Sequence, residues 1–381
     1  MEINDMSTKI FGTDEIWSSL REQGKPIVLY GMGNGADKII SVLESKGMEC
    51  ADVFASDDFV RGQFFHGKKV LKLSEVAAKY EDFNILVSFG SSLPEVMERI
   101  RGIASEYNLY APDVPVAGDN LFDAEFFYKN EEKIMRAREV FADERSREVY
   151  DELVRYKLDG RISHFDRTDR EGGLFSEVLS GGYEVYCDLG AYTGDTVAEA
   201  VALYPEINKI IAFEPSVKTF AKLQKNTADI ADKELILVNA CAWNKDGTAV
   251  FTDGSGRNST LAGASADKGK TLSGAKTKEI ATARPDAYMD VNGKSLLIKF
   301  DVEGAEREAI EGSLEAIKNN LTELCVSLYH RSEDIFELPL LIREILPDHK
   351  LFIEKTPYIP AWEINLYACV RHESKILGFR E

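Results

Sequence analysis

The stretch YEVYCDLGAYTGDTVAEAVALYPEINKIIAFEP, residues 183–215, decides the fold of this chain. Its alternating apolar residues end at Asp188 and a glycine turn that closes with Gly194, after which the apolar spacing becomes helical. A second apolar run then ends at Glu214, directly before a proline. This order of strand, turn, helix and strand predicts an open parallel sheet. Ligands bind at the carboxyl edge of such sheets, which makes both acids candidate binding residues.

The glycine spacing distinguishes between the two cofactors that this layout serves. The pyrophosphate of a dinucleotide needs G-x-G-x-x-G, with bare backbone N–H groups facing the anion. Here the pattern is D-x-G-x-x-x-G, and Asp188 enters the turn. An acidic turn repels a pyrophosphate but suits S-adenosylmethionine, which carries a sulfonium cation and no phosphate. Glu214 stands where an acid binds ribose hydroxyls and fits either cofactor. The alternative for this stretch alone is a Rossmann-type turn with an incidental acid.

Length and composition limit the classes of protein to which this chain can belong. The 381 residues suffice for two domains, because domains usually run to about 100–200 residues. The composition is 44% hydrophobic and 29% charged, and no apolar run approaches the ~20 residues of a membrane span. The polar start MEINDMSTKIF lacks the pattern of a signal peptide, so we expect a cytoplasmic protein. A net charge of −19 repels a phosphate backbone, so nucleic acid is not an expected partner.

The cysteines indicate neither disulfides nor zinc. Their number is odd, they are widely spaced, and most lie in apolar runs, which predicts reduced core residues. They are Cys50, Cys187, Cys241, Cys325 and Cys369. The sequence has no C-x-x-C pair, so we expect no structural zinc site. The spacing of acids and histidines does not show whether a divalent cation binds, and no metal site is predicted.

Residues 1–118 predict a small Rossmann-like α/β unit, with a strand, a glycine loop and a helix followed by further apolar strands. The pattern G-x-G-x-x-A from Gly31 to Ala36 matches a relaxed dinucleotide fingerprint, and Asp52 or Asp57 supplies the acid downstream. Glycine turns of this kind also occur in domains without a nucleotide. Structural support and binding of a nucleotide-linked or sugar ligand therefore remain open.

A turn-rich stretch with two prolines separates this unit from a charged segment. Apolar residues at helical spacing within residues 123–158 predict two linker helices with a solvated charged face, and the linker is assigned to residues 119–174. Residues 175–381 then form the catalytic half.

The second informative stretch is SLLIKFDVEGAEREAIEGSL, residues 295–314. Its buried apolar run ends in Asp301 and Glu303, ahead of a helix. Two acids at a strand end are costly unless they are paired, hydrogen-bonded or used in chemistry. A further strand ends in His330, and residues 349–370 predict a closing antiparallel pair of strands.

With these segments placed, residues from about 175 to 370 resemble the FkbM family of S-adenosylmethionine-dependent methyltransferases, which have the class I Rossmann-like fold. The motifs that carry the resemblance are DLGAYTGDT (188–196), FEPS (213–216), VNAC (238–241) and IKFDVEGAE (298–306). The last is the most specific, because a strand ending in acid-x-Glu-Gly-x-Glu is the hallmark of the family. The resemblance implies a parallel sheet whose last strand is antiparallel. One departure is SLYH before the next turn, where family members often have Glu-x-His.

The resemblance also implies S-adenosylmethionine as cofactor and assigns residue roles. Cofactor contacts are expected at Asp188, Gly190, Tyr192, Gly194, Thr196, Glu214, Asn239 and Asp301. Capping of the backbone is the alternative for the asparagine. If the acceptor is a hydroxyl, its proton must leave to a base with a suitable pKa. The candidates for this catalytic role are Asp301, Glu303 and His330, with structural ion pairing as the alternative. Arg257, Ser259 and Thr260, in a glycine-rich excursion, are candidate acceptor contacts.

The sequence thus predicts a two-domain α/β methyltransferase that moves a methyl group from S-adenosylmethionine to a hydroxyl of a sugar or glycan-like acceptor. The acceptor follows from the family resemblance alone. One alternative is an NAD(P)-dependent oxidoreductase that works through the N-terminal unit, although no Tyr-x-x-x-Lys pair is recognisable. The other is a non-catalytic protein that senses the cofactor or acts as a scaffold.

Overall fold

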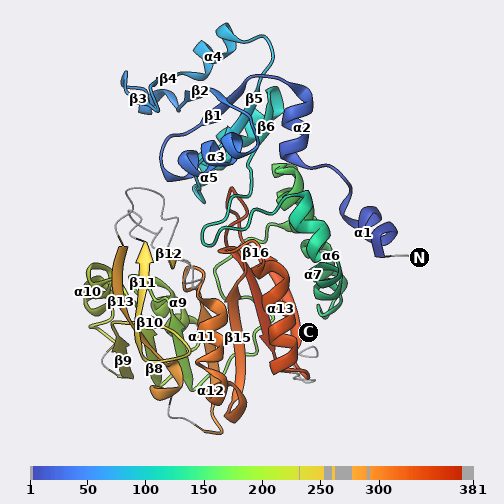
Figure 1. The fold of residues 1–381 in the computed structure, drawn as a ribbon. Helices are drawn as coiled ribbons and strands as arrows, with labels where there is room; N and C mark the ends of the chain where they lie inside the picture. Colours follow the sequence, from blue (N-terminus) through green and yellow to red (C-terminus); the bar gives the residue numbers. More distant parts are fainter. Residues whose placement is uncertain (1–2, 231, 253–259, 262–276, 290–291, 371–381) are drawn as a thin grey trace, which may run out of the picture.

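The computed structural model describes residues 3–230, 232–252, 260–261, 277–289 and 292–370. A smaller α/β unit lies above a larger one, and two long helices run along one side of the molecule (Figure 1). These are α6 (Ala124–Glu139) and α7 (Glu144–Asp159), the two helices predicted for the linker. Asp123 and Asp143 cap their first turns by accepting a backbone N–H.

The N-terminal unit has a mainly parallel sheet in the strand order β3-β4-β2-β1-β5-β6. Its strands are β1 (Ile27–Tyr30), β2 (Cys50–Phe54), β3 (Phe64–Phe65), β4 (Lys68–Leu71), β5 (Asn84–Val87) and β6 (Asn108–Tyr110). Its helices are α1 (Ile3–Phe11), α2 (Ile16–Gln23), α3 (Asn34–Ser45), α4 (Leu73–Lys79) and α5 (Pro94–Glu106), with a short turn η1 (Asp57–Phe59). The predicted α/β pattern is confirmed. The domain boundaries stay a prediction.

The C-terminal sheet has the order β16-β17-β15-β14-β7-β8-β9. Its strands are β7 (Val185–Leu189), β8 (Lys209–Phe213), β9 (Glu234–Val238), β14 (Ser295–Phe300), β15 (Leu321–Ser327), β16 (Lys350–Lys355) and β17 (Ile364–Cys369). β17 runs antiparallel to both of its neighbours, and the other pairs of adjacent strands are parallel, as the resemblance implies. The chain winds from β7 to β9 on one side and resumes with β14 on the other. The switch point between β7 and β14 is therefore the expected ligand crevice.

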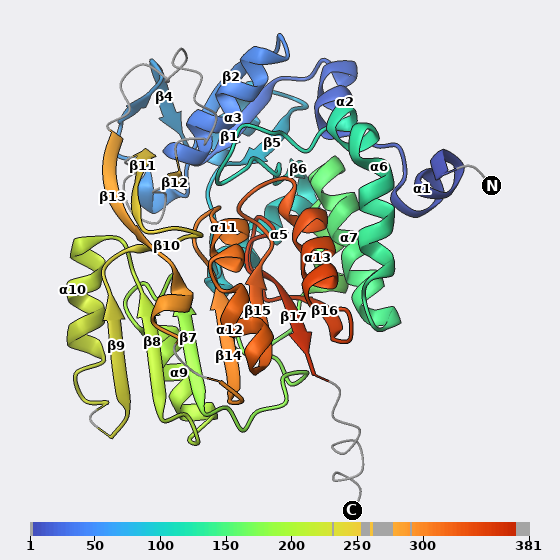
Figure 2. The ribbon, with the colours of Figure 1, turned by 60° about the horizontal axis from the view of Figure 1, so that its bottom comes forward.

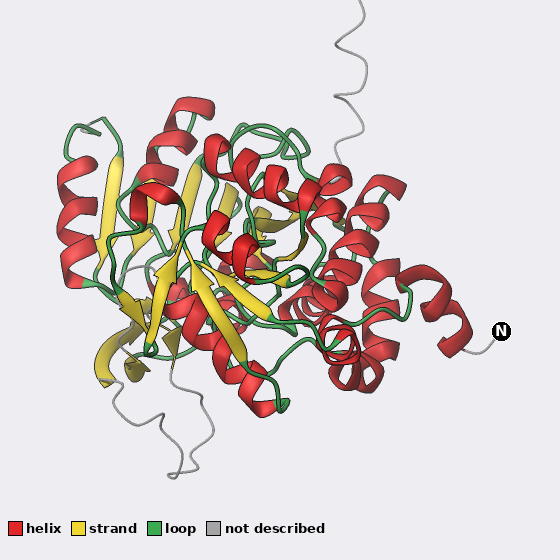
Figure 3. Cartoon of the chain, turned by 90° about the horizontal axis from the view of Figure 1, so that it is seen from above, coloured by secondary structure: helices red, strands yellow, loops and turns green. Residues whose placement is uncertain are grey.

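Alternate side chains of this sheet face two different layers of helices. Cys187 and Ile298 pack in one core with α11 (Glu306–Glu311), α12 (Leu314–Asn319) and α13 (Asp334–Ile345). Tyr186 and Leu297 pack in another core with α9 (Asp195–Leu203) and α10 (Val217–Asn226). Figure 2 shows α11, α12 and α13 in front of the sheet, and Figure 3 shows helices on both of its sides. All five cysteines are buried and free, as predicted.

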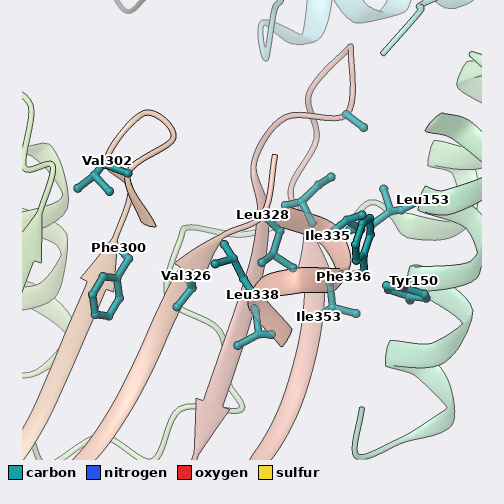
Figure 4. Packing of buried hydrophobic residues seen from close by; sticks show 14 of the residues in the cluster. Tyr150, Leu153, Phe300, Val302, Val326, Leu328, Ile335, Phe336, Leu338 and Ile353 are labelled. Atoms are coloured by element: carbon teal, nitrogen blue, oxygen red, sulfur yellow. The ribbon is translucent and has the colours of Figure 1, made fainter. Parts of the chain in front are cut away.

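Helices α6 and α7 contribute to the first of these cores. Ile335 and Phe336 of α13 lie between the strands and the side chains of Tyr150 and Leu153 on α7 (Figure 4). Apolar residues of both helices extend the core, and α7 also buries two charged side chains, Glu152 and Lys157. Burial of large side chains on both sides of this contact holds α7 to the C-terminal sheet.

The remaining short elements lie between these layers or beside the sheet. They are η2 (Ile162–His164), α8 (Phe165–Thr168), η3 (Pro285–Ala287) and the strands of a small second sheet, β10 (Cys241–Ala242), β11 (Gly247–Thr252), β12 (Thr260–Leu261) and β13 (Thr277–Ala283). In the part of the chain that the structure describes, no helix has the length and apolarity needed to cross a membrane.

The two units meet through the carboxyl edge of the N-terminal sheet. Ser91, just beyond β5, exchanges two backbone hydrogen bonds with Ile359 in the loop between β16 and β17. Gly90 is in such close contact with this loop that an added Cβ would lie 2.5 Å from the ring of Trp362. The same loop leads to the C-terminal ligand crevice through Glu363.

Candidate active site

A cavity of about 710 Å³ opens at the switch point of the C-terminal sheet. This volume lies within the ~300–1,000 Å³ that small-molecule sites usually have. Of the predicted site residues, the cavity is lined by Gly190, Tyr192, Thr196, Glu214, Asp301 and Glu303, whereas Asp188, Gly194, Asn239 and His330 are not part of the lining. The structure thus separates the predicted residues that face the cavity from those that lie behind it, and their functional roles stay predictions.

The two glycines of the first turn serve close packing. Gly190 has φ +93°, and an added Cβ would lie 1.8 Å from the carbonyl oxygen of Asp301, so the turns after β7 and β14 touch at this point. Gly194 has φ +86°, and its Cβ would lie 2.9 Å from Leu223 on α10. The structure shows that α10 fills the space beside Gly194. A contact between the backbone of Gly194 and the cofactor stays a prediction.

Asp188 is completely buried beneath the cavity. Its carboxylate accepts hydrogen bonds from the hydroxyl groups of Tyr186, at 2.9 Å, and Thr196. Lys299, directly opposite on β14, places its Nζ 3.3 Å from Asp188 Oδ1. A contact between Asp188 and a cofactor stays a prediction. In this structure Asp188 orients Thr196 and Lys299, and these two residues do line the cavity.

Lys299 joins the two halves of the site. Besides Asp188, its Nζ lies 3.2 Å from Asp301 Oδ2 and 3.3 Å from the carbonyl oxygen of Gly190. Burial disfavours the ammonium, but the two carboxylates outweigh it and raise the pKa of Lys299 above its usual range. The lysine is therefore charged and bonded to three acceptors. Lys299 was not among the predicted site residues, although a lysine inside the apolar run LLIKF was a usable signal.

Glu214 sits at the end of β8 and is almost fully buried. Burial raises its pKa to about 7, even though the backbone N–H groups of Ser216 and Tyr192 favour the ionised form. The bond from Ser216 measures 2.7 Å. Asn239 donates its amide to the carbonyl oxygens of Glu214, at 2.8 Å, and Pro215, at 3.3 Å. The predicted alternative of a backbone-capping asparagine is thus what the geometry shows.

The turn after β14 supplies the acids at the other end of the cavity. Asp301 accepts a hydrogen bond of 3.2 Å from the hydroxyl of Tyr329. Burial raises the pKa of Asp301, but the charges of Lys299 and His330 more than offset this and hold it below its usual value. Glu303 follows on the same turn and also faces the cavity. Asp301 is therefore ionised, and both acids remain candidate catalytic residues.

Backbone strain concentrates around this cavity. In the described residues, positive φ angles outside glycine occur at His66, Tyr192 (+45°), Glu303 (+55°) and Glu363 (+59°). The last three of these line the cavity. Such conformations cost about 1–3 kcal/mol each and tend to persist at functional sites, where the surrounding structure imposes them.

His330 lies behind the acidic turn and is completely buried. Its Nδ1 is 2.8 Å from Glu306 Oε1, and its Nε2 is 3.5 Å from Asp301 Oδ1 and 3.6 Å from Glu303 Oε2. Burial lowers the pKa of His330, but the three carboxylates outweigh this and raise it to about 10. A ring that holds its proton at neutral pH is a poor base. The contacts with three carboxylates therefore favour the predicted alternative of structural ion pairing, and the role as a base stays a prediction.

Some lining residues had no usable signal in the sequence. Glu363 comes from the loop between two late strands, and Tyr329 precedes the histidine that drew attention instead. Thr260 lies on β12, but the placement of its side chain, and all of Arg257 and Ser259, fall outside the described residues. Within the described ranges, no group of three or more His, Cys, Asp or Glu side chains is arranged to hold a metal ion.

Solved structures similar to this chain include several methyltransferases. The crystal structure of methyltransferase FkbM from Methylobacillus flagellatus KT matches with 17% identity and a TM-score of 0.69, covering 96% of this chain and 99% of that chain. A putative rRNA-methylase from Clostridium thermocellum matches with 13% identity and a TM-score of 0.30, over 50% of this chain and 87% of its own. Aeropyrum pernix fibrillarin, in complex with natively bound S-adenosyl-L-methionine, matches with 12% identity and a TM-score of 0.30, over 52% and 70%.

The first of these structures shows the fold, including the N-terminal unit. No curated protein matches the sequence. Residues 188–352 match the family described as the Methyltransferase FkbM domain, and this range includes the acids at the ends of β7, β8 and β14. Residues 188–352 of the chain therefore carry an FkbM methyltransferase domain.

Proposed function

We propose that this methyltransferase uses S-adenosylmethionine as methyl donor and methylates a hydroxyl of a neutral, sugar-like acceptor. The observation that carries the proposal is the charge of the cavity. The lining carboxylates are Asp195, Glu199, Glu214, Asp301, Glu303 and Glu363, against the ammonium groups of Lys218 and Lys299. Lys299 is already bonded to two carboxylates. Such a site attracts a sulfonium and an ammonium group and repels the pyrophosphate of a dinucleotide.

The lining residues suit the separate parts of S-adenosylmethionine. The buried carboxylate of Glu214 can accept hydrogen bonds from two ribose hydroxyls. The turn that contains Gly190 and Tyr192, together with Thr196, would hold the methionine end. When bound, S-adenosylmethionine supplies a methyl group activated by its sulfonium. Asn239 supports this site indirectly, because its amide fixes the backbone of Glu214.

The acidic end of the cavity supports a hydroxyl acceptor. Methyl transfer is an in-line displacement, so orientation alone can supply about 7–11 kcal/mol of the barrier. As the new C–O bond forms, the O–H proton passes to a carboxylate of the cavity wall. Asp301 and Glu303 both face the cavity, and Glu303 is the favoured acceptor because Lys299 and His330 hold the pKa of Asp301 below its usual value. Protonated His330 holds both acids from behind. Carboxylates also accept hydrogen bonds from the further hydroxyls of a polyol.

Calorimetry with S-adenosylmethionine, S-adenosylhomocysteine and NAD tests the cofactor. We expect both adenosyl compounds to bind, NAD not to bind, and Glu214→Ala to weaken binding by about 2–3 kcal/mol. Glu234→Ala, an exposed acid on the neighbouring strand β9, is the control and should leave the affinity unchanged. If NAD binds and S-adenosylmethionine does not, the result would favour the oxidoreductase alternative.

Transfer of a labelled methyl group to a mixed pool of sugars and glycans tests the reaction. Label in that pool is the expected result. Binding of S-adenosylmethionine without transfer to any hydroxyl compound would contradict methylation of hydroxyls and favour a cofactor sensor or scaffold.

A further inference from the structure

The N-terminal unit reaches the acidic turn of the active site through the 115–117 segment, Pro115–Val116–Ala117. The backbone N–H of Ala117 donates a 2.8 Å hydrogen bond to the carbonyl oxygen of His330. On its other side, Ala117 faces Gly304, where an added Cβ would lie 2.5 Å from the Ala117 Cβ. Gly304 also has φ +95°, so it leaves room for Ala117 by having no side chain. Ala117 is therefore wedged between the acidic turn and the end of β15.

The second anchor of this segment is Lys38 on α3 of the N-terminal unit. Its Nζ donates to the carbonyl oxygens of Pro115, at 2.7 Å, and Val116, at 2.9 Å. Burial lowers the pKa of Lys38, and the carboxylate of Glu303 raises it, which places this ammonium within electrostatic reach of the acidic turn. One lysine thus ties the 115–117 segment to α3.

Arg331 also holds the acidic turn, beside Ala117. Its Nε donates a 2.6 Å hydrogen bond to the carbonyl oxygen of Gly304. The next residue, Ser332, donates its hydroxyl to the carbonyl oxygen of Asn120, at 2.7 Å, just after the 115–117 segment. The acidic turn is therefore enclosed between its own domain and the segment that arrives from the N-terminal unit.

We propose that Lys38 is a positioning residue through which the N-terminal unit sets the place of Glu303 at the acceptor end of the cavity. The assignment of that end to the acceptor rests on the proposed function, whereas the mechanical link does not. Without the ammonium, the 115–117 segment loses two charge-assisted hydrogen bonds, and Ala117 no longer holds Gly304 and His330 together.

Hydrogen–deuterium exchange of the full chain without ligand tests the link. The backbone N–H groups of Val302 and Gly304 donate to Glu306 Oε1, at 2.9 and 3.4 Å, so their exchange reports on the order of the turn. In Lys38→Met we expect peptides covering residues 301–306 to exchange about tenfold faster or more, because charged hydrogen bonds are the strong ones. Peptides covering β7 should exchange as in the wild type.

Two variants separate positioning from a general loss of structure. Lys38→Arg retains the charge and the donors and should restore slow exchange. Lys46→Met is the matched control, because Lys46 is at the other end of α3 and also binds beyond its unit, at 2.9 Å from Asp123, but makes no contact with the 115–117 segment. It should leave residues 301–306 unchanged. Ala117→Gly removes the wedged methyl group and should cause a smaller increase in the exchange of residues 301–306. This variant keeps the proposal testable if Lys38→Met does not fold.

Three results would overturn the proposal. They are unchanged exchange of residues 301–306 in both Lys38→Met and Ala117→Gly, an equal increase in Lys46→Met, or a uniform increase over the whole C-terminal sheet. Failure of the proposed function has a different signature, since the wild type would then not bind S-adenosylhomocysteine while the exchange pattern remained.

Discussion

Lys299 and Asp188 lie directly opposite each other on the neighbouring parallel strands β14 and β7, with Nζ 3.3 Å from Oδ1, and both side chains are buried. A buried charge is costly unless it is paired and hydrogen-bonded. Asp301 completes the arrangement at 3.2 Å from the same Nζ. One ammonium group thereby holds the turn after β7 and the acidic turn after β14 in a fixed relation.

Removal of this ammonium should destabilise the protein strongly. Lys299→Met leaves Asp188 buried without its counter-charge, and we expect a loss of about 3–5 kcal/mol in the free energy of unfolding, measured in urea. Lys294→Met is the control, because Lys294 precedes the same strand and pairs with Glu184 at the surface, where water screens the charges. Asp188→Asn combined with Lys299→Met should recover part of the loss. Equal effects of the two single lysine variants would contradict the buried bridge.

The affinity for the adenosyl ligand should depend on the protonation of Glu214. Its pKa is raised to about 7 in the free protein, and ribose hydroxyls need the ionised carboxylate as acceptor. Below pH 7 the proton must leave on binding, so the affinity should fall by up to about tenfold per pH unit. Calorimetry with S-adenosylhomocysteine between pH 6 and pH 8 measures this, and Glu214→Gln should flatten the profile. An affinity that rises on acidification would exclude the role.

The contact between the two turns can be separated from the strain of a positive φ. Gly190 (φ +93°) and Gly182 (φ +71°) both have left-handed backbone conformations. A Cβ added to Gly190 would lie 1.8 Å from the carbonyl oxygen of Asp301, whereas a Cβ added to Gly182 would have no atom within 4 Å. Gly182→Ala should cost about 1–2 kcal/mol. Gly190→Ala should cost about 1–3 kcal/mol more, through overpacking, and should weaken ligand binding as well. Thermal unfolding with calorimetry compares the two, and equal costs would mean that the turns separate easily.

The charge of His330 predicts how stability changes with pH. Its pKa is about 10 in the folded protein, above the ordinary value near 6.5, so the folded state holds an extra proton between these values. The free energy of unfolding should therefore be highest below pH 6.5 and fall by up to ~1.4 kcal/mol per pH unit towards pH 10. In His330→Gln this part of the slope should vanish, whereas His66→Gln, at an exposed ion pair, should keep it. Identical slopes in the wild type and His330→Gln would show that the ring is neutral.

Much of the fold could be predicted because its signals are local. Apolar runs that end in Asp188, Glu214 and Asp301 located three strands and their common ligand edge, and the pattern after residue 349 predicted the antiparallel closing pair. Each of these signals depends on residues that are neighbours in the sequence.

The structure added what depends on strand register and on distant loops. The pairing of Lys299 with Asp188 follows from the alignment of β14 with β7, which no single segment specifies. The protonation of His330 depends on three carboxylates that surround it only in the folded state. Glu363 enters the site from a hairpin loop that also touches the N-terminal unit. Gly194 packs against Leu223 of α10, a contact that its own motif does not specify.

The central claim is that the cavity between β7, β8 and β14 binds the adenosyl cofactor. A crystal structure of the protein grown with saturating S-adenosylhomocysteine measures this directly. We expect the ligand in this cavity, with both ribose hydroxyls on the carboxylate of Glu214 and its amino-acid end at the turn after β7. A ligand bound elsewhere, or a cavity that stays empty at saturation, would contradict the claim.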